Sequence, residues 1–138
     1  MMTLKSPENL MALAEHAQAL AHAPYSSYPV GAALLARSGD VFLGCNVENA
    51  SFGLTICAER VAVFKAVSEG QREFEALAIA NPGRRGNGPC GACRQVLAEF
   101  STDLRIYVRE AEQGVLELRL DDLLPRAFSP QNLMRSEA

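Results

Sequence analysis

Cys57-Ala58-Glu59-Arg60 and Pro89-Cys90-Gly91-Ala92-Cys93 are the two stretches from which the architecture of this chain can be worked out. In the second stretch, two thiols stand three residues apart at a predicted helix start, so both can face one side of the first turn. The positive end of the helix dipole and the unpaired amides at that position favour thiolates. Cys57 stands at the start of another predicted helix, so the same argument applies to it.

Three thiolates on two helix starts predict a zinc site with Cys57, Cys90 and Cys93 as its protein ligands. Such a site leaves a fourth position for water, which catalytic zinc requires and structural zinc avoids. Glu59 stands two residues after Cys57. A carboxylate that does not bind the metal can take a proton from the attacking water and return it to a leaving amine. The combined C-x-E and P-C-x-x-C pattern is typical of zinc deaminases.

The spacing of Cys57 and Glu59 sets a condition on this site. Residues two apart on a regular helix point to nearly opposite sides, so Cys57 has to lie at the helix cap. Three thiolates on one dication also leave a net negative cluster, which weakens the acidifying effect of zinc on water. Arg60, next to Glu59, can offset that charge by donating hydrogen bonds to the thiolates.

Other interpretations of the cysteines remain open. A Cys-x-x-Cys pair alone also fits a redox-active site or two packed thiols. In a rival from a different functional class, Cys45 completes a closed four-thiolate zinc module that only stabilises the fold. That module leaves Glu59 without a purpose, and we expect Cys45, at the end of a predicted strand, to be a small core residue instead.

Length, charge and composition exclude several classes of protein. A chain of 138 residues, 49% of them hydrophobic, is expected to form a single domain over residues 1–138. The formal charge of −3 and the pI near 5.4 argue against binding of a long nucleic acid. We see no membrane-spanning run and no signal peptide. With four cysteines and no secretory signal, we expect a cytoplasmic protein with reduced thiols.

Hydrophobic periodicity predicts alternating strands and helices. An N-cap at Ser6 and a proline at position 7 predict a first helix that ends before Pro24. Helices are also expected over 57–70 and 90–100, with a helical turn over 121–124. Strands are expected over 30–36, 41–45, 74–80, 104–108 and 115–120. The order predicts a three-layer α/β/α sandwich around one mixed five-stranded sheet, in which the almost wholly apolar strand 74–80 is central.

Several linked motifs resemble the small cytidine deaminase family, and they cover nearly the whole chain. They are Val30-Gly31-Ala32-Ala33-Leu34-Leu35, Gly44-Cys45-Asn46-Val47-Glu48-Asn49-Ala50-Ser51, Cys57-Ala58-Glu59-Arg60 and Pro89-Cys90-Gly91-Ala92-Cys93-Arg94-Gln95, followed by Leu123-Leu124-Pro125 and Phe128. The resemblance implies a cytidine deaminase-like fold and one Zn²⁺ per chain.

The same resemblance implies hydrolytic deamination of cytidine and deoxycytidine to uridine and deoxyuridine, with release of ammonia, as in pyrimidine salvage. Cys57, Cys90 and Cys93 then hold zinc. Glu59 carries protons between the attacking water, ring N3 and the departing amine, and the backbone at Ala58 contacts the carbonyl oxygen of the ring. We expect water to attack C4 of cytosine, so the enzyme is a hydrolase of a cyclic amidine C–N bond.

For the sugar, the resemblance implies that Asn46 and Glu48 hydrogen-bond the ribose 3′ hydroxyl. A carboxylate suits a sugar hydroxyl better than a phosphate, so a nucleoside fits better than a nucleotide. The alternative is that both residues only stabilise the loop after a strand. Tyr28 stands where many relatives carry phenylalanine, and it keeps an aromatic pocket wall.

The family is typically homotetrameric with shared active sites. Phe128 matches an aromatic residue that packs on the pyrimidine in the site of a neighbouring subunit. Phe52 stands where many relatives carry tyrosine, so any hydrogen bond from that hydroxyl is lost here. The rival among enzymes is a deaminase of a cytosine-containing antibiotic of the blasticidin type, and the segment Asn46-Val47-Glu48-Asn49 argues against it.

Overall fold

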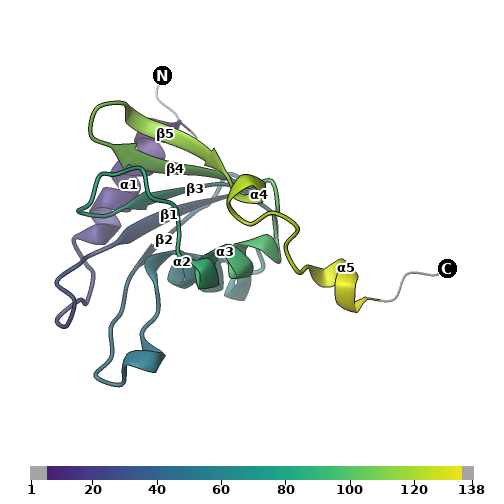
Figure 1. Ribbon diagram of the computed structural model, residues 1–138, viewed down its shortest axis with the longest axis horizontal. Coiled ribbons are helices and arrows are strands. Elements are labelled where there is room, and N and C mark those ends of the chain that lie inside the picture. The colour runs from purple at the N-terminus through teal and green to yellow at the C-terminus, as the bar shows by residue number, and fades with distance from the viewer. Residues whose placement is uncertain (1–5, 135–138) are drawn as a thin grey trace.

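Five strands form one mixed sheet in the order β2-β1-β3-β4-β5 in the computed structural model, which describes residues 6–134 (Figure 1). The strands are β1 (Gly31–Ala36), β2 (Val41–Cys45), β3 (Phe74–Ala80), β4 (Arg105–Glu110) and β5 (Gly114–Arg119). β3 pairs with β4 in parallel, and the other neighbours are antiparallel. The predicted five-stranded mixed sheet is confirmed, and β3 lies at its centre.

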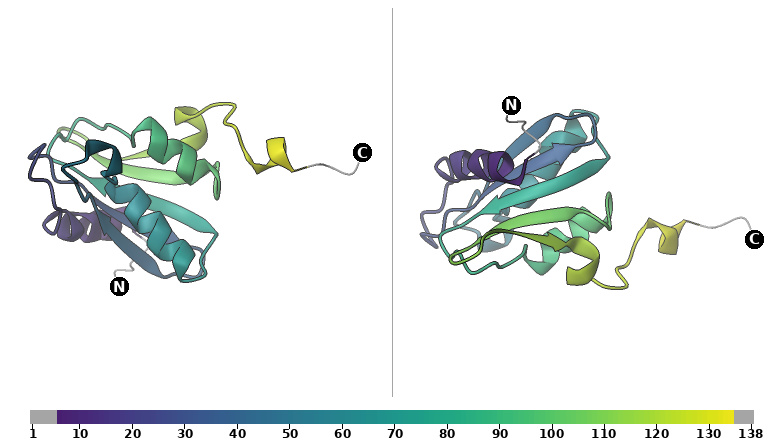
Figure 2. Two further views of the ribbon diagram at one scale, coloured as in Figure 1. Left: turned by 90° about the horizontal axis from the view of Figure 1, so that it is seen from below. Right: turned by 90° about the horizontal axis from the view of Figure 1, so that it is seen from above.

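Helices cover both faces of this sheet, which confirms the predicted three layers (Figure 2). α1 (Pro7–Gln18) packs on one face, and α2 (Ala58–Ser68) and α3 (Gly91–Ala98) pack on the other. Alternate residues of β1 divide between the two cores: Ala33 and Leu35 face α1, while Leu34 faces α2 and α3. This follows from the two-residue period of a strand.

Local sequence signals set most element boundaries. The Ser6 hydroxyl caps α1 by accepting a hydrogen bond from the Asn9 amide at 3.1 Å. The β1–β2 hairpin turns at Gly39, whose φ of +97° lies in the region that favours glycine. The predicted helices 57–70 and 90–100 are shorter in the structure: each starts one residue later, because Cys57 and Cys90 are N-caps, and they end at Ser68 and Ala98.

β2 and α2 approach each other closely at Gly44. A Cβ atom on Gly44 would lie 2.3 Å from the Ala58 carbonyl oxygen and 2.6 Å from the Ala62 amide nitrogen. The absence of a side chain therefore lets the first turn of α2 lie against the strand backbone. This contact sets the height of the N-terminus of α2 above the sheet.

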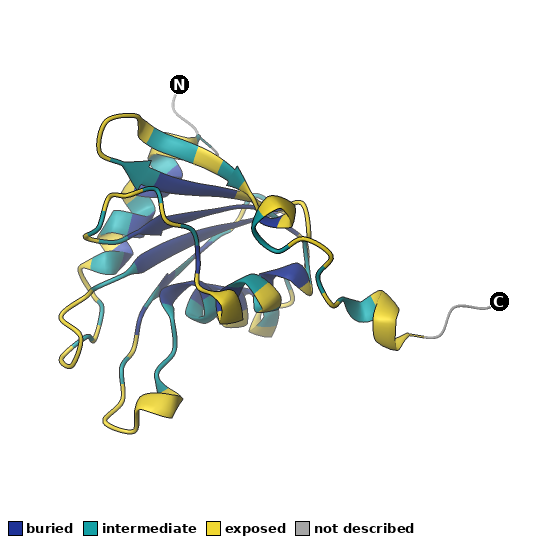
Figure 3. Cartoon of the chain, viewed as in Figure 1, coloured by how far each residue is buried: buried dark blue, intermediate teal, exposed yellow. Residues whose placement is uncertain are grey.

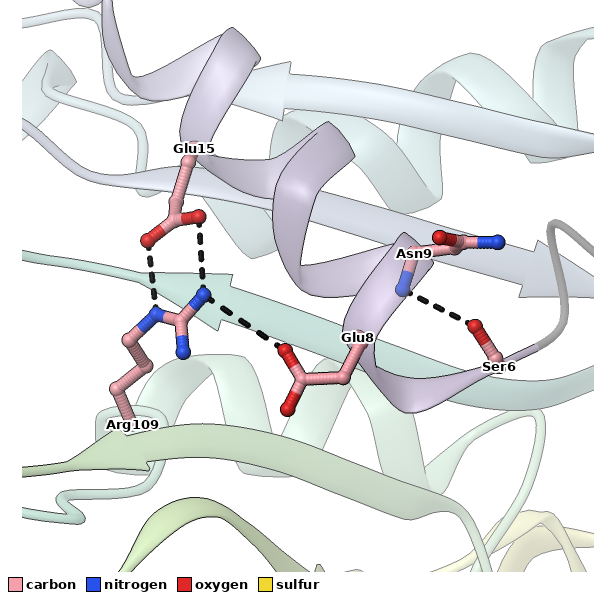
Figure 4. A network of polar contacts seen from close by, with 5 residues as sticks. All are labelled: Ser6, Glu8, Asn9, Glu15 and Arg109. Carbon is pink, nitrogen blue, oxygen red and sulfur yellow. Dashed lines mark hydrogen bonds and ion pairs between the residues drawn. The ribbon is translucent and has the colours of Figure 1, made fainter. Parts of the chain in front are cut away.

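Polar contacts join α1 to β4 (Figure 4). The Arg109 guanidinium donates from Nε and Nη2 to the two carboxylate oxygens of Glu15, at 2.8 and 3.1 Å. Glu8 Oε2 lies 4.0 Å from Arg109 Nη2. The bidentate pair holds the helix layer to the strand that neighbours β3.

Three short helical elements complete the described chain: η1 (Phe52–Leu54), α4 (Leu120–Leu123) and α5 (Pro130–Leu133). The α4 turn was predicted from the sequence, whereas η1 and α5 were not. α5 stands away from the sheet and is mostly exposed (Figures 1 and 3). Within residues 6–134, none of the helices has the length and apolar character needed to cross a membrane.

Candidate active site

The site lies at one edge of the sheet, where three strands meet in register. Gly31 at the start of β1 pairs with Cys45 at the end of β2 and with Ala80 at the end of β3. Asn46 and Asn81 leave the sheet just beyond this row. These loops and the starts of α2 and α3 surround the candidate site.

Three thiols gather at this edge. The Sγ atoms of Cys57, Cys90 and Cys93 all lie within 4.8 Å of one another, and those of Cys57 and Cys90 are 3.8 Å apart. Cys57 is the N-cap of α2, with extended φ and ψ of −71° and 153°, so the condition set by its spacing from Glu59 is met. Cys45 is not a member of the cluster, which argues against a closed four-thiolate module.

Arg60 contacts the thiol cluster. Its Nη2 donates to Cys57 Sγ at 3.3 Å. The Cys93 thiol and the Arg60 guanidinium lower the pKa of Cys57 to about 5, so Cys57 is a thiolate at neutral pH. That thiolate in turn raises the pKa values of Cys93 and Arg60. Three converging sulfurs with one already ionised suit a tetrahedral zinc ion that keeps a fourth position open.

Glu59 is a buried carboxyl beside these sulfurs, only 5% exposed. Burial raises its pKa to about 7, and the Cys57 thiolate adds to the rise by repelling a second negative charge. A group that gains and loses a proton near neutral pH suits general acid–base catalysis. The bound metal would add its own positive charge to this balance.

A cavity of about 340 Å³ opens in front of Glu59 and the thiols. Its volume falls in the range of about 300 to 1,000 Å³ typical of small-molecule sites. Val30, Ile56 and Ile79 form an apolar part of the cavity wall, against which a flat ring can pack. Seven of the candidate residues named from the sequence line it: Tyr28, Asn46, Glu48, Cys57, Ala58, Glu59 and Cys90.

The buried Asn46 amide already has two backbone partners. Its Oδ1 accepts from the Val30 amide at 2.9 Å, and its Nδ2 donates to the Tyr28 carbonyl at 3.0 Å. Asn46 therefore holds the segment that carries the aromatic wall. The structure supports the loop-stabilising interpretation and leaves one amide proton and one lone pair for a ligand.

Glu48, two residues after Asn46, also hydrogen-bonds a neighbouring loop, the one that contains Tyr25 and Ser26. It accepts hydrogen bonds from the Tyr25 amide at 2.9 Å, from the Ser26 amide at 3.1 Å and from the Ser26 hydroxyl. The Ser26 hydroxyl and the two amides lower the pKa of Glu48. Glu48 is therefore an ionised acceptor at the mouth of the cavity and stabilises the loop opposite it.

Phe128 is not brought into the cavity of its own chain. Its side chain is 56% exposed, and its carbonyl accepts a hydrogen bond from Gln95 Nε2 at 2.8 Å. Phe52 is 73% exposed and packs edge-to-face on Tyr25, with ring centroids 5.7 Å apart. A second hollow of about 360 Å³ lies between these two rings, Glu48 and Thr55.

Several polar residues at the site were not predicted from the sequence. Ser26, Thr55, Asn81 and Asn87 line the cavity, and Arg94 binds the loop before Cys90. Asn87 could have been suspected from its place directly before the Gly88-Pro89-Cys90 turn. No motif marks Ser26, Thr55 or Asn81, and Arg94 lies in the quoted segment that begins at Pro89 but was given no role there.

Comparisons with known proteins agree with this geometry. The family model described as "Cytidine and deoxycytidylate deaminase zinc-binding region" matches residues 4–109. A cytidine deaminase of Sporosarcina psychrophila is 46% identical over 127 residues, which cover 91% of this chain and 93% of that protein.

Solved structures of cytidine deaminases show the same fold. That of Burkholderia pseudomallei superposes with a TM-score of 0.84 at 44% identity, covering 89% of this chain and 99% of that one. That of Mycobacterium tuberculosis superposes with a TM-score of 0.77 at 43% identity, covering 88% and 95%. The three-thiol cluster, the match to a zinc-binding family model and the similarity over most of the chain all agree: this chain belongs to the cytidine and deoxycytidylate deaminase family and uses zinc.

Proposed function

We propose that this chain catalyses the hydrolytic deamination of cytidine and deoxycytidine to uridine and deoxyuridine, with release of ammonia, in pyrimidine salvage. One observation carries the proposal. A buried carboxyl with a pKa near 7 lies beside three converging thiols, at the end of a cavity of about 340 Å³. Hydrolysis of an aromatic amine needs both an activated water and a residue that moves protons.

Cys57, Cys90 and Cys93 hold one Zn²⁺ per chain in this proposal. When bound, zinc supplies the Lewis acidity that makes water a nucleophile near neutral pH. Arg60 offsets part of the negative charge of the three thiolates through its hydrogen bond to Cys57. Arg60 thereby preserves some of the acidifying effect that three thiolates would weaken.

Glu59 moves the protons. Its carboxylate takes a proton from the water that attacks C4 and delivers it to ring N3. It then takes the remaining proton of the new hydroxyl and delivers it to the exocyclic nitrogen, which leaves as ammonia while the C4 carbonyl forms. One water is consumed and one ammonia is released. A carboxyl poised near neutrality can both accept and donate at each turnover.

The remaining lining residues position the nucleoside. Tyr28 forms the aromatic wall for the ring, and the backbone at Ala58 contacts the ring carbonyl oxygen. Asn46 and the ionised Glu48 bind the ribose 3′ hydroxyl with the hydrogen-bonding capacity that the loops leave free. The charge of Glu48 disfavours a phosphate at the mouth, which supports a nucleoside over a nucleotide or a nucleic acid.

We further propose a homotetramer with shared active sites. Exposed apolar side chains cluster on η1 and on the C-terminal segment: Phe52, Leu54, Phe128, Leu133 and Met134 are each at least 56% exposed. Subunit contacts would bury them, and Phe128 would reach the pyrimidine in a neighbouring cavity. Light scattering of the purified protein should give about four times the chain mass of 14.9 kDa, and a monomer would contradict this proposal.

Domain organisation and location are likewise proposals. We propose one domain over residues 1–138, since every described strand belongs to one sheet. We also propose a cytoplasmic location, because a reducing compartment keeps cysteines as free thiols that can bind zinc. The four cysteines are unpaired in the structure, which agrees with that setting.

The decisive experiment follows the fall in ultraviolet absorbance of cytidine and measures zinc in the same samples. We expect turnover and about one zinc per chain in the native protein. Glu59→Gln should keep zinc and the fold but lose nearly all turnover, because the amide cannot transfer the protons. Cys45→Ser should keep its zinc, whereas the closed four-thiolate module requires its loss.

Native turnover in Glu59→Gln would refute the role of Glu59. A zinc-replete native protein that leaves both nucleosides unchanged would refute the substrate. If the same protein then deaminates blasticidin S, the antibiotic-directed alternative holds instead, because a site built to bind ribose should prefer the nucleosides.

A further inference from the structure

We infer that Arg94 is a positioning residue that fixes the turn carrying Cys90 and joins it to the C-terminal part of the chain. Arg94 is the fourth residue of α3 and is half-buried. Its Nε donates to the Pro89 carbonyl at 2.7 Å, and its Nη1 donates to the Leu123 carbonyl at 2.9 Å. The inference rests on the proposed role of Cys90 as a zinc ligand.

Arg94 hydrogen-bonds the carbonyls on both sides of the Cys90 Cα atom, that of Pro89 and that of Cys90 itself. Its backbone amide donates to the Cys90 carbonyl at 3.0 Å, and its side chain reaches back to the carbonyl of the buried Pro89. Cys90 itself is exposed, so little packing holds it in place. The backbone bond forms with any residue at position 94, so it is the side-chain bond to Pro89 that fixes the peptide before Cys90 and with it the orientation of Sγ, as hydrogen bonds to the groups around a metal ligand orient the ligand in other proteins.

The hydrogen bond from Arg94 Nη1 pairs a carbonyl at the C-terminal end of α4. Leu123 is the last residue of α4, and its carbonyl is among those that a helix leaves without an internal partner. The loop before Pro89 also packs here, because a Cβ on Gly88 would lie 3.0 Å from Leu123 Cδ1 and 3.7 Å from Arg94 Nη2. α4, the loop and the Cys90 turn thus share one contact region.

The side chain of Arg94 is suited to two carbonyls in a way that lysine is not. The guanidinium presents several donors in a rigid plane, whereas the lysine ammonium is one flexible point. Within residues 6–134, Arg94 has no carboxylate within 4.0 Å, so the two carbonyls are its principal partners. The neighbouring Gln95 binds the Phe128 carbonyl, so α3 holds both ends of the 123–128 segment.

The test measures how fast the zinc-loaded protein releases its zinc to a chromogenic chelator at neutral pH. Arg94→Lys keeps the charge but cannot bridge both carbonyls, and we expect zinc release about 10 to 100 times faster than in the native protein. The cobalt-substituted variant should also show shifted d–d bands, since the geometry of the Cys90 ligand changes. Its kcat should fall more than its KM rises, because the nucleoside contacts stay intact.

Arg109→Lys is the matched control, because it weakens a bidentate arginine contact of similar burial on the other face of the sheet. Its zinc release should equal that of the native protein. Native release in Arg94→Lys overturns the inference, and so does equal acceleration in both variants. If Arg94→Lys does not fold, Arg94→Gln is judged by the same criteria.

A Cys90→Ser variant separates failure of this inference from failure of the proposed site. If Cys90→Ser binds zinc as tightly as the native protein, Cys90 is not a ligand and the proposed site itself is wrong. If Cys90→Ser loses zinc while Arg94→Lys releases it at the native rate, only the role of Arg94 is wrong.

Discussion

Adding one methyl group at Gly44 should displace α2, which carries the proposed catalytic Glu59. The new Cβ would lie 2.3 Å from the Ala58 carbonyl oxygen, and ordinary contacts begin at 3.4 Å, so α2 must move by about 1 Å. The Ala58 oxygen and the Ala62 amide nitrogen, 2.6 Å from the new Cβ, are both backbone atoms, so no side-chain rotation can relieve the clash. We expect overpacking to cost about 1 to 3 kcal/mol, or about 3 to 12 °C in Tm for a chain of this size.

The same shift acts on the proposed catalysis, because Cys57 caps α2 and Glu59 lies in its first turn. A misplacement of about 1 Å can lower turnover by about 100-fold, since reacting groups lose their alignment. Differential scanning calorimetry and the cytidine absorbance assay measure the two effects on Gly44→Ala. Gly53→Ala is the control for stability, because a Cβ there meets nothing within 4 Å.

Two results would refute this reasoning about Gly44. The first is a Gly44→Ala protein with the Tm and turnover of the native chain, which would mean that β2 and α2 do not approach closely. The second is an equal loss of Tm in Gly53→Ala, which would trace the effect to glycine removal in general.

Two further predictions concern hydrogen bonds outside the thiol cluster. The Arg109 guanidinium lowers the pKa of Glu15 below its ordinary 4.5, so the pair stabilises the fold above that pH and loses its contribution as pH falls through the lowered value. Glu15→Gln should therefore cost about 1 kcal/mol at pH 7 and nothing once both forms are neutral, as urea unfolding across pH can show. Asn46→Ala should destabilise by about 2 to 3 kcal/mol and raise KM, because the Val30 amide and the Tyr28 carbonyl lose their partner; unchanged unfolding with a raised KM would instead favour a purely ribose-binding role.

Much of the fold followed from local patterns. The apolar run at β3 predicted a central strand covered on both faces, and six of its seven residues are buried. Ser6 and Gly39 marked a helix start and a hairpin turn where the structure has them. These predictions were accurate because period, cap chemistry and turn geometry depend on residues a few positions apart. η1 and α5 were not predicted: η1 has three residues and no period to detect, whereas Ser129 and Pro130 carry the same start signal for α5 that Ser6 and Pro7 carry for α1.

The chemistry of the site was also visible in part. Three cysteines and one glutamate at these spacings named candidate zinc ligands and a candidate proton carrier, because few other functions need that combination of residue types. The cap position of Cys57 could be stated as a condition. Only the folded chain shows that it is met, with Cys57 and Cys90 brought from 33 residues apart to 3.8 Å.

The sequence by itself therefore determined the layer order, the ligand types and the family resemblance of this protein. The tertiary structure alone decided that Cys45 lies outside the thiol cluster, that Asn46 and Glu48 hold neighbouring loops, and that Arg94 joins the Cys90 turn to Leu123. The physical reason why these contacts could not be predicted is the kind of group to which the side chains bind. Most of these bonds end on backbone amides and carbonyls, which every residue carries, so no residue type in the sequence marks where they will form.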